Sequence, residues 1–192
     1  MVSEIFVEKK ILRDKIRKEL ESLTLENYIE LSKKVSKNLW SFLNHQKVIQ
    51  EKVQVGAYSP FEREPIWYQE LEASLIRLSF PSLGKDLNQM CFRASTLSEL
   101  IEKKDFGSII QGPKESNEEV IPQLILIPGI AFNSKGERLG RGKGYFDRYL
   151  ENYQGIRVGL CFELQLVDQI PTDVHDKKMQ WLITEKNIYK IS

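Results

Sequence analysis

The sequence predicts an α/β fold, with residues 1–192 forming a single three-layer domain: a mostly parallel sheet with helices on both faces. Helical and strand-like periodicities alternate along the chain, which is typical of a layered α/β domain. The uninterrupted apolar run at 124–127 indicates a strand buried on both faces. With 192 residues, the chain is long enough to bury roughly 70% of its unfolded surface. These observations favour one sizeable core.

Two amphipathic helices are expected first, because apolar residues recur every three or four positions between 11 and 20 and again between 31 and 43. Thr24 is a suitable N-cap for the second helix. A strand at 53–58, a helix at 65–75 and short strands at 78–80 and 90–94 follow. The polar segment 111–119 is predicted to be a mobile loop.

The second half continues the alternation. Pro128 and Gly129 end the strand at 124–127, and a glycine-rich loop leads to a helix at 145–153. A strand at 156–162 and a terminal hairpin of 181–184 with 188–191 complete the pattern. Ligands bind at the carboxyl ends of parallel strands, and the segments 58–64 and 129–144 both begin there. We therefore expect one cleft that holds two substrates.

Composition excludes several classes of protein. The 28 Lys and Arg residues against 27 Asp and Glu give a net charge of +1, which argues against a surface devoted to nucleic acid. Cys91 and Cys161 lie far apart and outside any CxxC motif, so we exclude a zinc site and expect two buried thiols. No segment has the length of a signal peptide's apolar core or of a membrane span. The expected protein is cytoplasmic, monomeric and not associated with membranes.

The loop between residues 136 and 144 carries most of the chemical information. Glycines at 136, 140, 142 and 144 let the backbone lie close to a bound group, while Arg138, Arg141 and Lys143 add positive charge. The loop's amides and the start of the next helix would converge on a phosphate, so a polyphosphate ligand is predicted. The pattern is neither a Walker motif nor a dinucleotide fingerprint. A mobile, solvated glycine loop is the alternative.

The segment PGIAFNSKGERLGRGKGYFDRYL closely resembles the signature of the 5-formyltetrahydrofolate cyclo-ligase family. The resemblance extends to Lys9 and Arg13, to VGAYSPFEREP, and to VGLCFELQLVDQIPTDVHD, and so covers nearly the whole chain. It is looser between about 76 and 120. The chain departs from the family at three positions: Asn133 stands where Asp is usual, Phe146 where Tyr is common, and Gly112 where Glu is frequent.

This resemblance implies an enzyme that uses ATP to close 5-formyltetrahydrofolate into 5,10-methenyltetrahydrofolate, through a phosphorylated formyl group. Arg138 and Lys143 are the implied catalytic residues. The implied ATP ligands are Lys9, Arg13, Arg138, Gly140, Arg141, Gly142, Lys143, Gly144, Tyr145 and Phe146. The cofactor would be Mg²⁺, held by Asp147 and Asp176, although a helix-dipole partner and a turn residue are equally good interpretations of these two from the residues alone.

Folate requires a flat apolar slot and a carboxylate that accepts from the pterin. The resemblance assigns this carboxylate to Glu64, at a strand end expected to lie away from the glycine loop, with Tyr58 and Tyr145 as ring faces. Aromatic residues beside strands more often belong to the core. Two other functions remain open: another ATP-using phosphotransferase on this scaffold, or an RNA-binding module that uses the six cations between residues 9 and 18.

Overall fold

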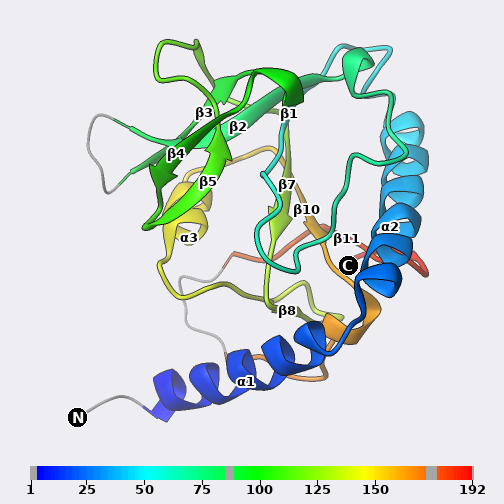
Figure 1. The fold of residues 1–192 in the computed structure, drawn as a ribbon, viewed down its shortest axis with the longest axis vertical. Helices are drawn as coiled ribbons and strands as arrows, with labels where there is room; N and C mark the ends of the chain where they lie inside the picture. The colour runs from blue at the N-terminus through cyan, green and yellow to red at the C-terminus, as the bar shows by residue number, and fades with distance from the viewer. Residues whose placement is uncertain (1–3, 85–88, 172–176, 192) are drawn as a thin grey trace.

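The computed structural model describes residues 4–84, 89–171 and 177–191 (Figure 1). Its α-helices are Glu4–Glu21 (α1), Leu25–His45 (α2) and Tyr145–Leu150 (α3). Its strands are Gln54–Gly56 (β1), Arg77–Leu83 (β2), Met90–Ala94 (β3), Ile101–Asp105 (β4), Ser108–Gly112 (β5), Glu119–Val120 (β6), Leu124–Pro128 (β7), Ala131–Phe132 (β8), Arg138–Leu139 (β9), Ile156–Leu160 (β10), Trp181–Ile183 (β11) and Ile188–Lys190 (β12). Short 3₁₀ turns lie at Ala73–Leu75, Leu97–Glu99 and Glu163–Gln165.

Eight of these strands form one sheet in the order β12-β11-β10-β7-β1-β2-β3-β6. The strands from β11 to β2 run parallel, and β12, β3 and β6 pair antiparallel at the two edges. This confirms the prediction of a mostly parallel sheet. The terminal hairpin of β11 and β12 is confirmed as well.

The central strand β7 separates two cores, as expected for a strand buried on both faces. Leu124 and Leu126 pack into the cluster that α2 covers with Leu39 and Phe42. The alternate residues Ile125 and Ile127 face the cluster that includes Leu150 of α3. Side chains alternate between the faces of a strand, so this apolar run supplies both cores and the three-layer prediction is confirmed.

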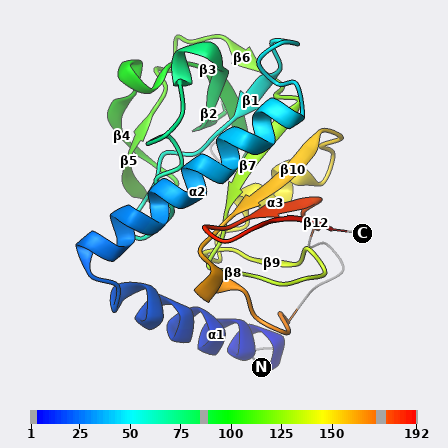
Figure 2. The same cartoon turned by 90° about the vertical axis from the view of Figure 1, so that its right-hand side faces the viewer.

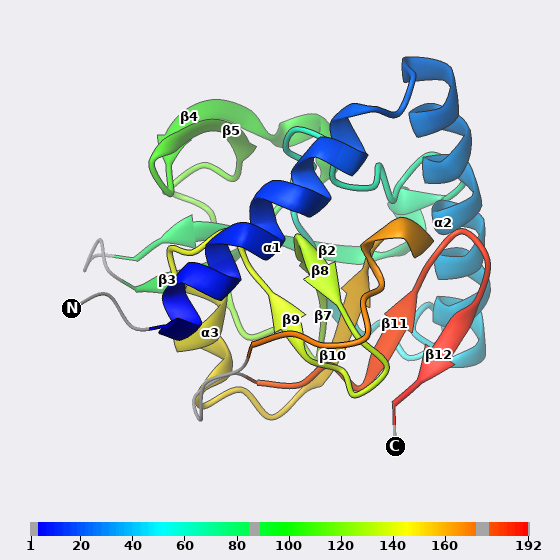
Figure 3. The ribbon, with the colours of Figure 1, turned by 90° about the horizontal axis from the view of Figure 1, so that it is seen from below.

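The helix α1 stands apart from these layers. It crosses below the sheet, beside β8 and β9 (Figures 2 and 3), and buries Ile16 and Leu20 in a third cluster with Ile130, Leu139 and Phe162. The next helix begins where predicted, because the Thr24 hydroxyl accepts from the amide of Asn27. Among the described residues, no helix is long and apolar enough to cross a membrane.

The predicted helix at 65–75 is wrong; only Ala73–Leu75 forms a single 3₁₀ turn. The amides of Ile66 and Glu70 instead donate to the hydroxyls of Ser32 and Ser36 on α2, at 3.2 and 2.8 Å. The indole of Trp67 is fully buried and donates to the carbonyl of Tyr58 at 2.8 Å. These long-range bonds satisfy backbone amides that a local helix would otherwise have to satisfy, so the segment folds against α2 and forms no helix of its own.

Two further predictions need correction. The β4–β5 hairpin was not predicted, and its last two residues are the first two of the segment predicted as a mobile loop at 111–119. The helix α3 is also shorter than predicted, because it ends at Leu150 rather than at 153. With only six residues, α3 has little dipole to offer a phosphate.

Candidate active site

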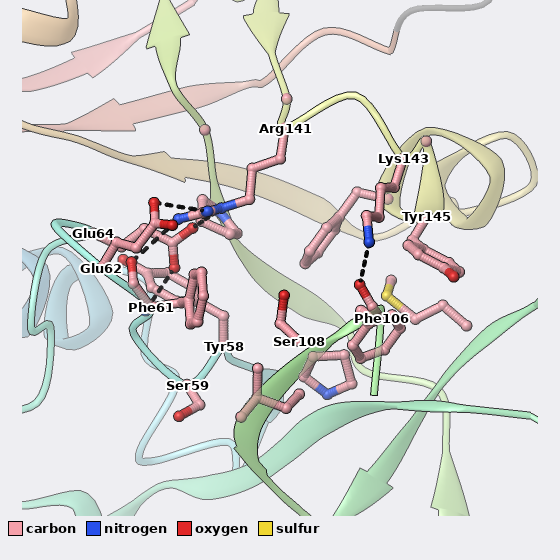
Figure 4. A pocket seen from close by; sticks show the side chains of 18 of the residues that line it. Tyr58, Ser59, Phe61, Glu62, Glu64, Phe106, Ser108, Arg141, Lys143 and Tyr145 are labelled. Atoms are coloured by element: carbon pink, nitrogen blue, oxygen red, sulfur yellow. Dashed lines mark hydrogen bonds and ion pairs between the residues drawn. The ribbon is translucent and has the colours of Figure 1, made fainter. Parts of the chain in front are cut away.

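A cavity of about 320 Å³ lies beyond the carboxyl ends of β1 and β7, between the glycine loop, the segment 58–64 and the β4–β5 hairpin (Figure 4). This confirms that the two predicted segments share one cleft. The predicted site residues that line it are Tyr58, Glu64, Arg138, Gly140, Arg141, Lys143, Gly144, Tyr145, Phe146 and Asp147. Lys9, Arg13 and Gly142 are not among its lining residues.

Arg138 is held inside the wall of this cavity. Its Nη2 donates to Oδ1 of Asp147 at 2.5 Å, and its Nη1 donates to the carbonyl of Pro128 at 3.2 Å. The guanidinium also lies over the ring of Phe146, 5.7 Å from its centre. A side chain on Gly140 would meet this guanidinium, since a Cβ there would be 2.9 Å from Nη1. Arg138 therefore joins β7, the loop and α3, and glycine at 140 makes room for it.

Arg141 points across the cavity from the loop to the segment 61–64 (Figure 4). Its Nε donates to Oε1 of Glu64 and its Nη1 to Oε2 of Glu62, both at 3.0 Å. Its Nη2 donates to the carbonyl of Phe61 at 3.2 Å, and its guanidinium lies 4.7 Å from the centre of the Phe61 ring. The glycine loop and the segment 58–64 are thus in direct contact.

Glu64 is therefore not remote from the glycine loop, and that expectation is wrong. The residue is 8% exposed, its Oε2 accepts from the amide of Phe61, and its own carbonyl accepts from the hydroxyl of Tyr28. Burial raises the pKa of the Glu64 carboxyl, and the charge of Arg141 opposes this shift. A carboxylate with one cationic partner and one amide at a cavity wall can exchange that partner for a ligand.

Lys143 and Tyr145 form the opposite wall, next to the hairpin. The ammonium of Lys143 donates to the carbonyl of Phe106 at 3.0 Å, and the rings of Phe106 and Tyr145 meet edge to face with centroids 4.9 Å apart. The hairpin tip is thereby attached to the loop at one end of the cavity. Tyr58 lies deeper, only 3% exposed, and its hydroxyl donates to the carbonyl of Pro65. Most of its ring belongs to the core, so it offers the cavity little more than an edge.

Arg13 approaches the loop from outside the cavity. Its Nε donates to the carbonyl of Gly140 at 2.8 Å, and a side chain on Gly142 would come within 3.5 Å of its guanidinium. Burial lowers the pKa of Arg13, and the charge of Arg17 acts in the same direction. Gly142 has a φ of 101°, a conformation that strains any other residue. Lys9 lies one turn earlier on α1 and is half-buried.

Several residues that line the cavity were not predicted from the sequence. Arg17 lines both this cavity and an adjoining one, also of about 320 Å³, that α1 covers. Its spacing of four residues from Arg13 was an available signal, since both lie on one helical face. The apolar wall from the sheet edge and the hairpin gave no local signal; it consists of Pro81, Met90, Phe106 and Ile110.

Of the two predicted magnesium ligands, Asp147 lies at this cavity. Asp147 lines the cavity with 35% of its side chain exposed, although Arg138 engages its Oδ1. The other predicted ligand, Asp176, lies outside the described residues. Within the described ranges, no group of three or more His, Cys, Asp or Glu side chains could hold a metal by itself. Since Mg²⁺ usually keeps several waters and binds substrate phosphates, one carboxylate beside the cavity fits such an ion.

Two of the three departures from the family pattern, Asn133 and Gly112, make contacts in the structure that bear on the residue present. Asn133 is buried, its Oδ1 accepts from the amides of Lys135 and Glu137, and its Nδ2 donates to Glu137 at 2.6 Å. An aspartate could accept the first two bonds but could not donate the third. Gly112 lies in β5, where a Cβ would come within 2.9 Å of the Lys103 side chain. Both cysteines are free and buried, as predicted.

Comparisons with known proteins identify the family of this chain. The model of the 5-formyltetrahydrofolate cyclo-ligase family matches residues 5–185. A mouse 5-formyltetrahydrofolate cyclo-ligase is 28% identical over 92% of this chain and 93% of its own length. A probable 5-formyltetrahydrofolate cyclo-ligase from Schizosaccharomyces pombe is 34% identical, in a match that spans 40% of this chain and less than half (44%) of that protein.

Solved structures are similar over nearly the whole chain. The NMR structure of the Aquifex aeolicus 5,10-methenyltetrahydrofolate synthetase superposes with a TM-score of 0.80 at 29% identity, covering 95% of this chain and 92% of the other. A Mycoplasma pneumoniae 5,10-methenyltetrahydrofolate synthetase, at 22% identity and a TM-score of 0.72, shares the fold. Taken with the match of the family model over residues 5–185, these likenesses show that the chain belongs to the 5-formyltetrahydrofolate cyclo-ligase family.

Proposed function

We propose that this protein, with residues 1–192 acting as one domain, converts 5-formyltetrahydrofolate and ATP to 5,10-methenyltetrahydrofolate, ADP and phosphate. One observation carries the proposal. A single cavity is lined on one side by a loop of glycines and cations and on the other by a buried carboxylate with apolar walls. The first suits a polyphosphate and the second suits a pterin, so both substrates would meet in one space.

The chemistry requires activation of a poor leaving group. The formyl oxygen would attack the γ-phosphorus of ATP, and ADP would leave with the electrons of the broken P–O bond. The resulting phosphorylated formyl group has an electrophilic carbon. N10 would attack that carbon, lose its proton, and displace phosphate as the ring closes. Such a sequence needs no covalent nucleophile from the protein, and it depends on positioning and on neutralising phosphate charge.

The glycine loop would supply that neutralisation. Arg141 and Lys143 line the cavity with cationic groups, and Arg13 braces the loop through the Gly140 carbonyl. Arg138 contributes differently, because its bonds to the Pro128 carbonyl and to Asp147 hold the loop in place and orient Asp147. Asp147 would then hold Mg²⁺ against the phosphates, and that ion would neutralise further phosphate charge when bound.

The folate would lie between Glu64 and the hairpin. Glu64 presents its carboxylate at one end of the cavity, while Phe106 and Tyr145 line the other (Figure 4). The ring faces of Phe61 and Tyr145 and the side chains of the apolar wall can sandwich a flat heterocycle. Arranged in this way, the formyl group would lie between the pterin site and the phosphates on the loop.

The test is to incubate the purified protein with 5-formyltetrahydrofolate, ATP and Mg²⁺ and to follow the absorbance band of the methenyl product. We expect product to form only when all three are present, with one ADP and one phosphate released for each product. Product formed equally well without ATP would contradict the proposal. ADP released at the same rate without folate would instead indicate a phosphotransferase with another acceptor.

A further inference from the structure

The two halves of the proposed site are bound to each other. Three donors of Arg141 are engaged by the segment 61–64: Nε by Glu64, Nη1 by Glu62 and Nη2 by the carbonyl of Phe61. Conversely, Oε1 of Glu64 accepts from Arg141. The proposed phosphate ligand and the proposed folate ligand therefore occupy one another, and neither is fully available to a substrate in this arrangement.

We propose that Arg141 changes partners when the substrates bind: a nucleotide phosphate draws its guanidinium away from Glu64, which then accepts from the folate. This inference rests on the proposed function. It predicts that each substrate makes the other bind more tightly. By thermodynamic reciprocity, the factor by which ATP increases folate affinity equals the factor by which folate increases ATP affinity.

The sign of this coupling follows from burial. The side chain of Glu64 is 10% exposed, so losing Arg141 to a nucleotide leaves a carboxylate that water reaches poorly. Nucleotide binding alone bears this cost. Folate binding alone has to displace Arg141 from Glu64 with no phosphate to receive it. When both substrates are present, the phosphate satisfies the guanidinium and the pterin donors satisfy the carboxylate. The free-energy cost of separating Arg141 from Glu64 is then offset at both groups, so the second substrate binds without it.

Glu62 has a different place in this arrangement. Its side chain is 54% exposed, so water can replace Arg141 at little cost. Its φ of 55° places it in the left-handed region, which an ordinary residue occupies when its surroundings impose that conformation. We infer that Glu62 holds Arg141 towards the segment 61–64 when the site is empty. Removing its charge should favour the nucleotide but should leave the coupling through Glu64 in place.

The experiment measures the dissociation constant of 5-formyltetrahydrofolate by calorimetry, with and without a saturating β,γ-imido analogue of ATP and Mg²⁺. In the wild-type protein, the analogue should tighten folate binding by at least about fivefold. In Glu64→Gln, this ratio should fall to about one, and the analogue alone should bind more tightly than it does to wild type. In Glu62→Gln, the analogue should also bind more tightly, but the ratio should stay at its wild-type value.

Arg63→Gln is the matched control. Arg63 lies between the two glutamates, but its guanidinium is over the ring of Tyr28, 5.1 Å from the centroid. Its loss should change neither the ratio nor the affinity for the analogue by more than about twofold. Where Glu64→Gln binds folate too weakly to titrate, Arg141→Gln removes the same pair from the other side and should also give a ratio of about one.

A ratio of one in the wild-type protein, with both ligands bound, would overturn the coupling and leave the proposed function intact. A wild-type ratio retained in Glu64→Gln or in Arg141→Gln would also overturn it. An equal loss of the ratio in Glu62→Gln, or a loss in Arg63→Gln, would show that general charge sets the ratio, against partner exchange. A protein that binds neither ligand would instead refute the proposed function itself.

Discussion

Replacing Arg138 by alanine is expected to destabilise the protein, and any loss of nucleotide affinity should follow from that. Arg138 is 8% exposed and pairs with Asp147. Its guanidinium also lies over the ring of Phe146 and donates to the carbonyl of Pro128. A phosphate ligand would need donors directed into the cavity. The Nη1 and Nη2 donors of Arg138 are directed at the protein, so its first role is to hold the strand, the loop and the helix together.

The magnitude follows from these contacts. Truncating one partner of a buried ion pair costs about 3 to 5 kcal/mol, because the other charge stays buried without compensation. Asp147 keeps 35% of its side chain exposed, so water can solvate part of the charge left behind. The lower end of the range, about 3 kcal/mol, therefore applies. For a chain of this length that corresponds to a decrease in Tm of about 6 to 12 °C.

Urea unfolding, followed by tryptophan fluorescence, measures this loss directly. Arg148→Ala is the control, because Arg148 is an exposed arginine of α3 that donates to the Lys143 carbonyl at 3.1 Å. Its loss should cost less than about 1 kcal/mol. Arg138→Lys should fall between the two, since lysine keeps the charge but not the planar set of donors. An Arg138→Ala protein of wild-type stability that has lost only nucleotide affinity would refute this reasoning.

Three other predictions follow from the structure. Burial raises the pKa of Glu64 above its ordinary 4.5, so the native state holds this proton more tightly than the unfolded state. The stability that Glu64 contributes is therefore greatest below pH 4.5 and is lost as the pH rises through the native pKa. Urea unfolding at several pH values should show that the wild-type protein loses stability relative to Glu64→Gln as the pH rises. A difference that stays constant with pH would contradict a raised pKa for Glu64. Gly136→Ala should lower the free energy of unfolding by about 2 kcal/mol or more, because the φ of Gly136 is 76° and a Cβ there would lie 2.5 Å from the Met179 carbonyl oxygen. An unchanged Tm in thermal unfolding would show that this turn can shift to make room. Arg17→Gln should weaken binding of the imido analogue of ATP about tenfold in calorimetry, because Arg17 lines both cavities. It should change stability by less than about 0.5 kcal/mol, because no hydrogen bond or ion pair is found for Arg17 among the described residues. Unchanged affinity for the analogue would exclude Arg17 from the nucleotide site.

The parts of the fold that could be predicted are those with a local periodic signal. The spacing of apolar residues locates α2, and the Thr24 hydroxyl fixes its first turn, because both depend on residues within one or two helical turns. The run of residues 124–127 likewise identifies β7, since only a strand between two helical layers buries both of its faces. The loop's glycines and cations indicate an anion site, because charge and backbone freedom are properties of the residues themselves, and this site stays a prediction.

The tertiary structure alone decided which partner each side chain takes. The segment 65–75 reads as a helix, yet its amides bond to two serines of α2, more than 30 positions away. Arg138 and Arg141 look alike in the sequence, but the first is enclosed beside Asp147 while the second crosses the cavity to Glu64. A guanidinium binds whichever acceptor the fold brings within about 3 Å. That choice depends on long-range packing, so the sequence could place the two segments in one cleft but could not pair Arg141 with Glu64.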